Sequence, residues 1–67
     1  MSDKNERKIK LLEEVRGEVM SEINKNNAEL DKLRHSEELF FEKVMELEIN
    51  FKNIKVIDKK LHSLRYA

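Results

Sequence analysis

The chain has 67 residues, of which 42% are charged and 39% are apolar, and its 14 basic and 14 acidic side chains cancel. This length allows a single domain with a small core, and the absence of cysteine excludes disulfides and thiolate metal sites. Zero net charge argues against general affinity for nucleic acid or anionic lipid, and no apolar run is long enough for a membrane span or a signal peptide. We therefore expect a cytoplasmic protein without a cofactor, a metal or a small-molecule substrate.

Helical spacing of apolar residues begins near the N-terminus and continues along the chain. There is no proline, the only glycine is Gly17, and no alternating pattern indicates a strand. Steps of three and four residues define a heptad seam, which predicts an all-α fold in which one helix stripe faces another. The seam runs through Ile9, Leu12, Arg16, Val19, Ile23, Asn26, Leu30, Leu33, Glu37, Phe40, Val44, Leu47, Phe51, Ile54, Asp58, Leu61 and Arg65.

The stretch 24–28 reads Asn-Lys-Asn-Asn-Ala and is the first candidate for a turn. Asparagine competes for backbone hydrogen bonds, and Asn26 with Glu29 has the spacing of a capping box. This predicts an antiparallel two-helix hairpin with helix 1 at about 3–24, a turn at about 24–27 and helix 2 at about 27–65. The heptad register also passes through this stretch without a slip, so one long coiled-coil helix is the alternative.

The second predicted helix carries more apolar residues than one partner helix covers. We expect the surplus to form a protein-interaction surface, most simply with a second copy of the chain or else with a helical partner protein. Positions 36–48 are acidic and positions 49–67 basic, which favours an antiparallel homodimer and hence a four-helix bundle. The candidate interaction residues are Phe40, Phe41, Val44, Met45, Ile49, Val56 and Ile57.

One polar cluster, His35-Ser36-Glu37-Glu38, combines a histidine with a hydroxyl group. Adjacent groups of these types are found in nucleophilic and phosphoryl-transfer sites. Serine followed by two acidic residues is also typical of a helix start, where the hydroxyl caps the helix and the acids complement its dipole.

The segment from Leu33 to Leu39 resembles the Ser-Gln-Glu-Leu-Asp signature of the Spo0E-like aspartyl-phosphate phosphatases, which are short helical hairpins. Ser36, Glu38 and Leu39 match the signature, Glu37 replaces its glutamine, and Phe40 stands at the position of its aspartate. The resemblance implies, as an alternative function, a phosphatase that acts on a response regulator.

A further alternative is a nucleic-acid accessory protein. It would use the basic C-terminal segment, although that segment lacks the arginine density and exposed aromatics of a dedicated binder. The interpretation that accounts for most of the sequence is a non-enzymatic, self-associating helical interaction module, either a regulator or an assembly subunit. The basic segment consists of Lys52, Lys55, Lys59, Lys60, His62 and Arg65.

Overall fold

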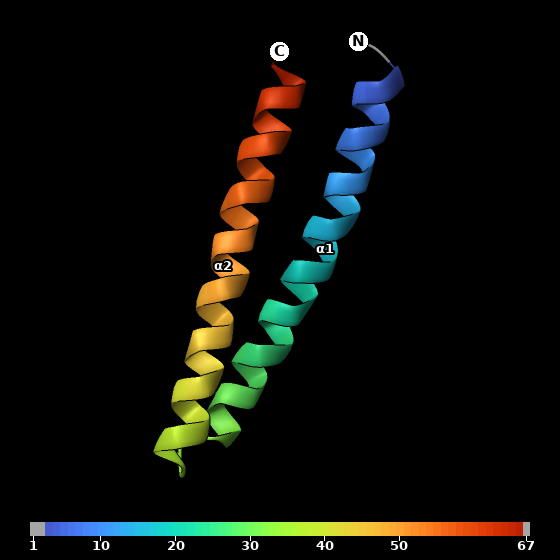
Figure 1. Ribbon diagram of the computed structural model, residues 1–67. Helices are drawn as coiled ribbons and strands as arrows, with labels where there is room; N and C mark the ends of the chain where they lie inside the picture. Colours follow the sequence, from blue (N-terminus) through green and yellow to red (C-terminus); the bar gives the residue numbers. More distant parts are fainter. Residues whose placement is uncertain (1–2, 67) are drawn as a thin grey trace.

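The protein folds as an antiparallel hairpin of two helices in a computed structural model that describes residues 3–66. Helix α1 spans Asp3–Lys32 and helix α2 spans Glu37–Arg65, with 30 and 29 residues respectively. The molecule measures 51 × 14 × 12 Å, and both ends of the chain lie at the same end of the rod, here called the open end (Figure 1). The predicted all-α hairpin is confirmed, and the alternative of one long helix is wrong.

The turn lies about nine residues later than the sequence predicted. The Asn-rich stretch 24–27 is helical within α1, and the chain reverses at 33–36 instead. Asparagine costs well under about 1 kcal/mol in a helix interior. Helices of nearly equal length can pack along their whole extent, whereas a turn at 24–27 would leave much of the second helix without a partner. The predicted bounds of 3–24 and 27–65 are corrected accordingly.

The connection is short and uses ordinary backbone conformations. The amide of Leu33 donates to the carbonyl of Leu30 at 3.1 Å, and the amide of Ser36 donates to the carbonyl of Leu33 at 3.0 Å. Ser36 is the N-cap of α2, where its hydroxyl accepts from the amide of Leu39 at 3.5 Å. Within the described residues no backbone has a positive φ. The turn therefore needs neither glycine nor asparagine, the residues that usually reveal a turn in a sequence.

The two helices meet along the predicted seam in α1 and along a shifted seam in α2. The buried α2 positions include Asn50 and Ile57, while Phe51, which the heptad pattern placed in the seam, is 50% exposed. The shift places Asn50 beside Asn26 and leaves Asp58 at the edge of the contact. Two α2 positions in the helix contact, Asn50 and Ile57, thus lie one residue earlier than Phe51 and Asp58, which the heptad pattern had predicted.

The core between the helices is a single thin layer. The most buried apolar residues are Ile23 at 4%, Leu47 at 7%, Ile57 at 7% and Leu61 at 4% exposure, and no large described side chain falls below 2%. A chain of this size with so small a core has little stability of its own. At the same time many large apolar side chains remain exposed, namely Leu11, Val15, Leu39, Phe41, Met45, Ile49, Phe51, Val56 and Tyr66.

Candidate functional site

Four of the exposed apolar residues form a row along α2, here called the outer row. They are Phe41, Met45, Ile49 and Val56, with exposures of 64%, 51%, 59% and 54%. At 100° per residue these four lie within about 80° of one another around the helix. Phe41 lies about two and a half turns before the buried Asn50, which places the two on opposite sides of α2. The outer row therefore faces away from α1.

The other three predicted interaction residues lie elsewhere. Phe40 and Val44 are half-buried at the flank of the helix contact. Ile57 is 7% exposed and belongs to the core of the hairpin, so it is unavailable to a partner. The error follows from the shifted seam, because Ile57 takes the inward position that the heptad pattern gave to Asp58.

The surface near the start of α2 combines aromatic and acidic side chains. An open groove of about 710 Å³ lies at this end of the helix, next to the turn. Phenylalanine rings in a rim of carboxylates present apolar area inside a negative potential. The residues that line this acidic groove are Glu37, Glu38, Phe40, Phe41 and Glu42.

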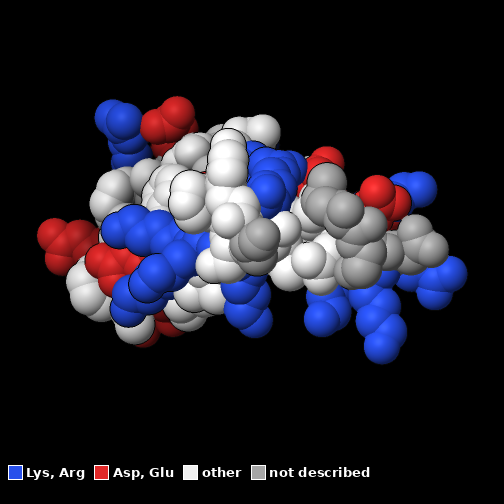
Figure 2. Space-filling model, turned by 90° about the horizontal axis from the view of Figure 1, so that it is seen from above, with Lys and Arg blue, Asp and Glu red and all other residues white. Residues whose placement is uncertain are grey.

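A second apolar groove, of about 490 Å³, lies at the open end and has a basic rim. Figure 2 looks down on this end and shows many Lys and Arg side chains there, with Asp and Glu side chains among them. Lys8 of α1 forms one wall of the groove, a contribution that the sequence could not reveal, because helix pairing brings Lys8 beside residues about fifty positions later. The residues that line this basic groove are Lys8, Val56, Lys59, Lys60, Ser63 and Leu64.

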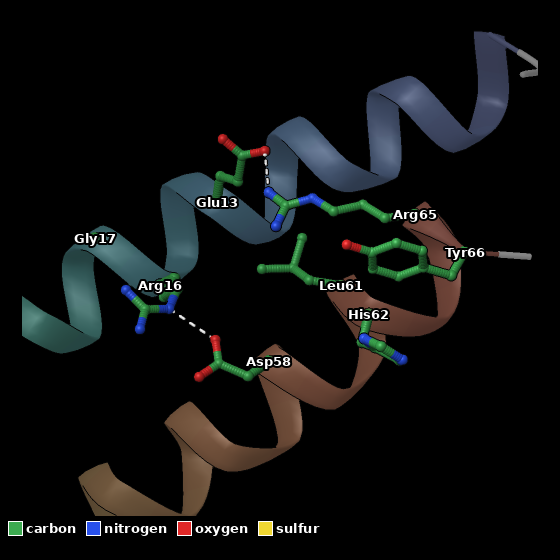
Figure 3. Close-up of a pocket in the computed structure, with 8 residues that line it drawn as sticks. All are labelled: Glu13, Arg16, Gly17, Asp58, Leu61, His62, Arg65 and Tyr66. Carbon is green, nitrogen blue, oxygen red and sulfur yellow. Dashed lines mark hydrogen bonds and ion pairs between the residues drawn. The ribbon is translucent and has the colours of Figure 1, made fainter.

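Ion pairs occupy the opposite side of the hairpin. Arg16 Nε contacts Asp58 Oδ1 at 2.7 Å, and Arg65 contacts Glu13 at 2.8 Å (Figure 3). The hydrogen bond from Arg16 to Asp58 and then the charge of Asp58 raise the pKa of Arg16. Val56 and Asp58 are two residues apart, or 200° around the helix, so the basic groove and these ion pairs lie on different flanks of α2.

A polar layer crosses the middle of the helix contact. Asn26 Nδ2 donates to Asn50 Oδ1 at 3.0 Å, and Asn50 Nδ2 donates to Glu22 at 3.1 Å. Lys43, whose side chain is 16% exposed, contacts Glu29 at 2.8 Å. The hydrogen bond from Lys43 and then its charge lower the pKa of Glu29, and the same hydrogen bond, donated to Glu29, contributes most to raising the pKa of Lys43. Every polar group in this layer serves the packing of the two helices.

The remaining polar candidates have structural positions. Ser36 caps α2, with Glu37 and Glu38 in its first turn, which matches the helix-start interpretation of that cluster. Arg65, from the basic segment, is paired with Glu13. Within residues 3–66 no group of three histidine or acidic side chains is arranged to hold a metal ion. Over the same residues no helix combines the length and the apolar character needed to cross a membrane.

Comparisons with known proteins add no relatives. The chain matches no protein-family model, and neither curated proteins nor solved structures show significant similarity to it. The surface of the hairpin is therefore the source of the functional proposal below.

Proposed function

We propose that the protein is a small helical interaction module that associates with itself through the outer row of α2. The observation that carries the proposal is the position of Phe41, Met45, Ile49 and Val56 on the side of α2 that α1 leaves uncovered. Large apolar residues scattered singly over a surface are ordinary, but a row of four on one helix face, here broken only by Lys52, is typical of an interface.

The thin core supports the same proposal. Two helices of about 30 residues share one layer of buried side chains. Fully burying a side chain such as phenylalanine or isoleucine contributes roughly 1.5–3 kcal/mol. Packing a second hairpin against the outer row would thus give a four-helix assembly with a second apolar layer.

The test compares two identical substitutions on one helix. Phe41→Lys places a positive charge in the outer row, whereas Phe51→Lys places one at a 50% exposed position outside it. Ile49 and Phe51 lie 200° apart around α2, so Phe51 is directed away from the proposed interface. Both variants are measured by sedimentation equilibrium, starting from a wild-type chain of 8.1 kDa.

We expect wild type and Phe51→Lys to sediment as oligomers and Phe41→Lys to shift to the monomer mass, with a loss of at least about tenfold in affinity, or about 1.4 kcal/mol. Helical circular dichroism checks that both variants remain folded at the concentrations used. Equal losses for the two variants would contradict the proposal, and so would a wild-type chain that is monomeric at millimolar concentration.

A further inference from the structure

The two grooves of the hairpin lie at opposite ends of α2 and have opposite charge. At the turn end Phe41 stands among Glu37, Glu38 and Glu42. At the open end an apolar floor is surrounded by Lys8, Lys59 and Lys60. One end thus carries an aromatic side chain with acidic neighbours, and the other carries an apolar hollow with basic neighbours.

We infer that the outer row binds a second copy of this chain in an antiparallel arrangement, with Phe41 of each copy seated in the basic groove of the other. The inference rests on the proposed self-association and specifies its geometry. A two-fold axis perpendicular to α2 is required, because it exchanges the two ends of the helix between copies. Such an interface uses the same surface on both subunits and closes as a dimer.

One antiparallel register gives the outer row contacts at both ends and in the middle of α2. Placing Met45 beside the partner's Val56 brings Phe41 to the level of the partner's Lys59 and Lys60. The same register places Ile49 at the level of the partner's Lys52, whose aliphatic stem can cover it. Each member of the outer row then meets an apolar side chain or a lysine stem across the interface, and the two-fold axis passes near the middle of α2.

The charges select this orientation over a parallel one. In the antiparallel register Glu42 lies beside the partner's Lys60, because both residues lie on the same flank of the outer row, and symmetry provides the contact twice. A parallel pair would instead bring the acidic turn ends of the two copies together, and likewise their basic open ends, which is repulsive. Individual exposed ion pairs are weak, so their main effect is to choose the orientation while the apolar contacts supply affinity.

Helix α1 takes part through Lys8. This side chain forms a wall of the basic groove together with Val56 and Leu64 of α2. An isolated α2 helix would lack that wall. The hairpin turn therefore contributes to the docking surface as well as to the fold.

The absence of cysteine from the chain allows a direct test of orientation. Two single-cysteine variants, Met45→Cys and Val56→Cys, are oxidised separately and as an equal mixture, and disulfide-linked dimers are measured by mass. Both positions are more than half exposed, so neither substitution disturbs the core. In the antiparallel register the two cysteines lie side by side only in the mixed dimer. Identical cysteines lie about 16 Å apart along the axis, too far for a disulfide.

We expect cross-linking in the mixture and little in either variant alone. The reverse pattern indicates a parallel dimer and overturns this inference, while the proposed self-association stands. A dimeric mass without cross-linking in any sample overturns the register. A wild-type chain that is monomeric at every concentration overturns the proposed function together with this inference.

A charge exchange tests the same register without cysteine. Glu42→Lys and Lys60→Glu each create two repulsive contacts in their homodimers, and each is expected to weaken self-association by about five- to tenfold. Mixing the two variants restores both pairs in the mixed dimer, so the mixture should associate with nearly wild-type affinity. A mixture no stronger than the separate variants overturns the pairing of Glu42 with the partner's Lys60.

Discussion

Asn26 and Asn50 join the two helices through a side-chain hydrogen bond of 3.0 Å near the middle of the hairpin. Asn50 is 6% exposed and also donates to Glu22, so neither end of its amide lacks a partner. A buried amide pair fits only one alignment of two helices, because sliding either helix leaves polar groups without hydrogen bonds. The pair therefore fixes the register in which α1 and α2 pack.

Replacing one asparagine of this pair should lower the free energy of unfolding more than replacing both. Asn50→Leu leaves the amide of Asn26 without its acceptor in a half-buried site, and we expect a loss of about 1–3 kcal/mol in the free energy of unfolding. The double variant Asn26→Leu with Asn50→Leu replaces both groups by apolar ones and should recover most of that loss or exceed wild type. Urea unfolding measures both.

Asn53→Leu is the matched control, because Asn53 is exposed on the same helix. It should change the unfolding free energy by no more than about 0.5 kcal/mol. A double variant less stable than Asn50→Leu alone would show that the amide pair does not act as a unit.

The contact between Lys43 and Glu29 predicts how the free energy of unfolding depends on pH below about 4.5. The hydrogen bond and the charge of Lys43 hold the pKa of Glu29 below its ordinary value of 4.5. The folded state thus binds a proton at Glu29 less readily than the unfolded chain, so the contribution of this group is present above about pH 4.5 and is lost as the pH falls through the native pKa. Lys43→Met should move the pKa of Glu29 up towards 4.5 and make stability less sensitive to pH in this range.

The measurement is an NMR titration of the Glu29 carboxyl group in wild type and variants. Lys25→Met serves as the control, since the charge of Lys25 contributes less to the same shift. It should raise the pKa of Glu29 less than Lys43→Met does. Equal shifts in the two variants would indicate that general positive charge, rather than the close contact, sets the pKa.

The helical hairpin followed from the sequence, but the place of the turn did not. The spacing of Ile9, Val19 and Ile23 alone predicts which side of α1 is buried, because that pattern depends only on helix geometry. The turn at 33–36 uses no residue with special backbone needs, so its only sequence signal was Ser36 with its two acidic neighbours. The shift that buries Ile57 goes together with the pairing of Asn50 with Asn26, and such a pairing cannot be recognised until the partner helix is placed.

The N-cap at Ser36 should make a measurable contribution to the stability of the protein. Its hydroxyl satisfies a free amide at the start of α2, so Ser36→Ala should lower the free energy of unfolding by about 1 kcal/mol, and Ser36→Asp should preserve stability. Ser21→Ala is the control, because Ser21 is exposed within α1, where alanine is at least as favourable. If all three variants unfold at the wild-type temperature, the cap contributes nothing and the turn is held by helix packing alone.

Gly17 offers the opposite case, a residue whose replacement should stabilise the protein. It lies in the interior of α1, and a Cβ atom added there would meet nothing within 4 Å. Alanine restricts the unfolded chain and suits the helix, so Gly17→Ala should raise the free energy of unfolding by about 0.5–1 kcal/mol. Glu18→Ala, at the next and exposed position, should change it by less than about 0.5 kcal/mol. Thermal unfolding at fixed protein concentration tests both variants. A loss of stability in Gly17→Ala would mean that another chain packs closely against this glycine. That contact would lie on the ion-paired side of the hairpin and not on the outer row.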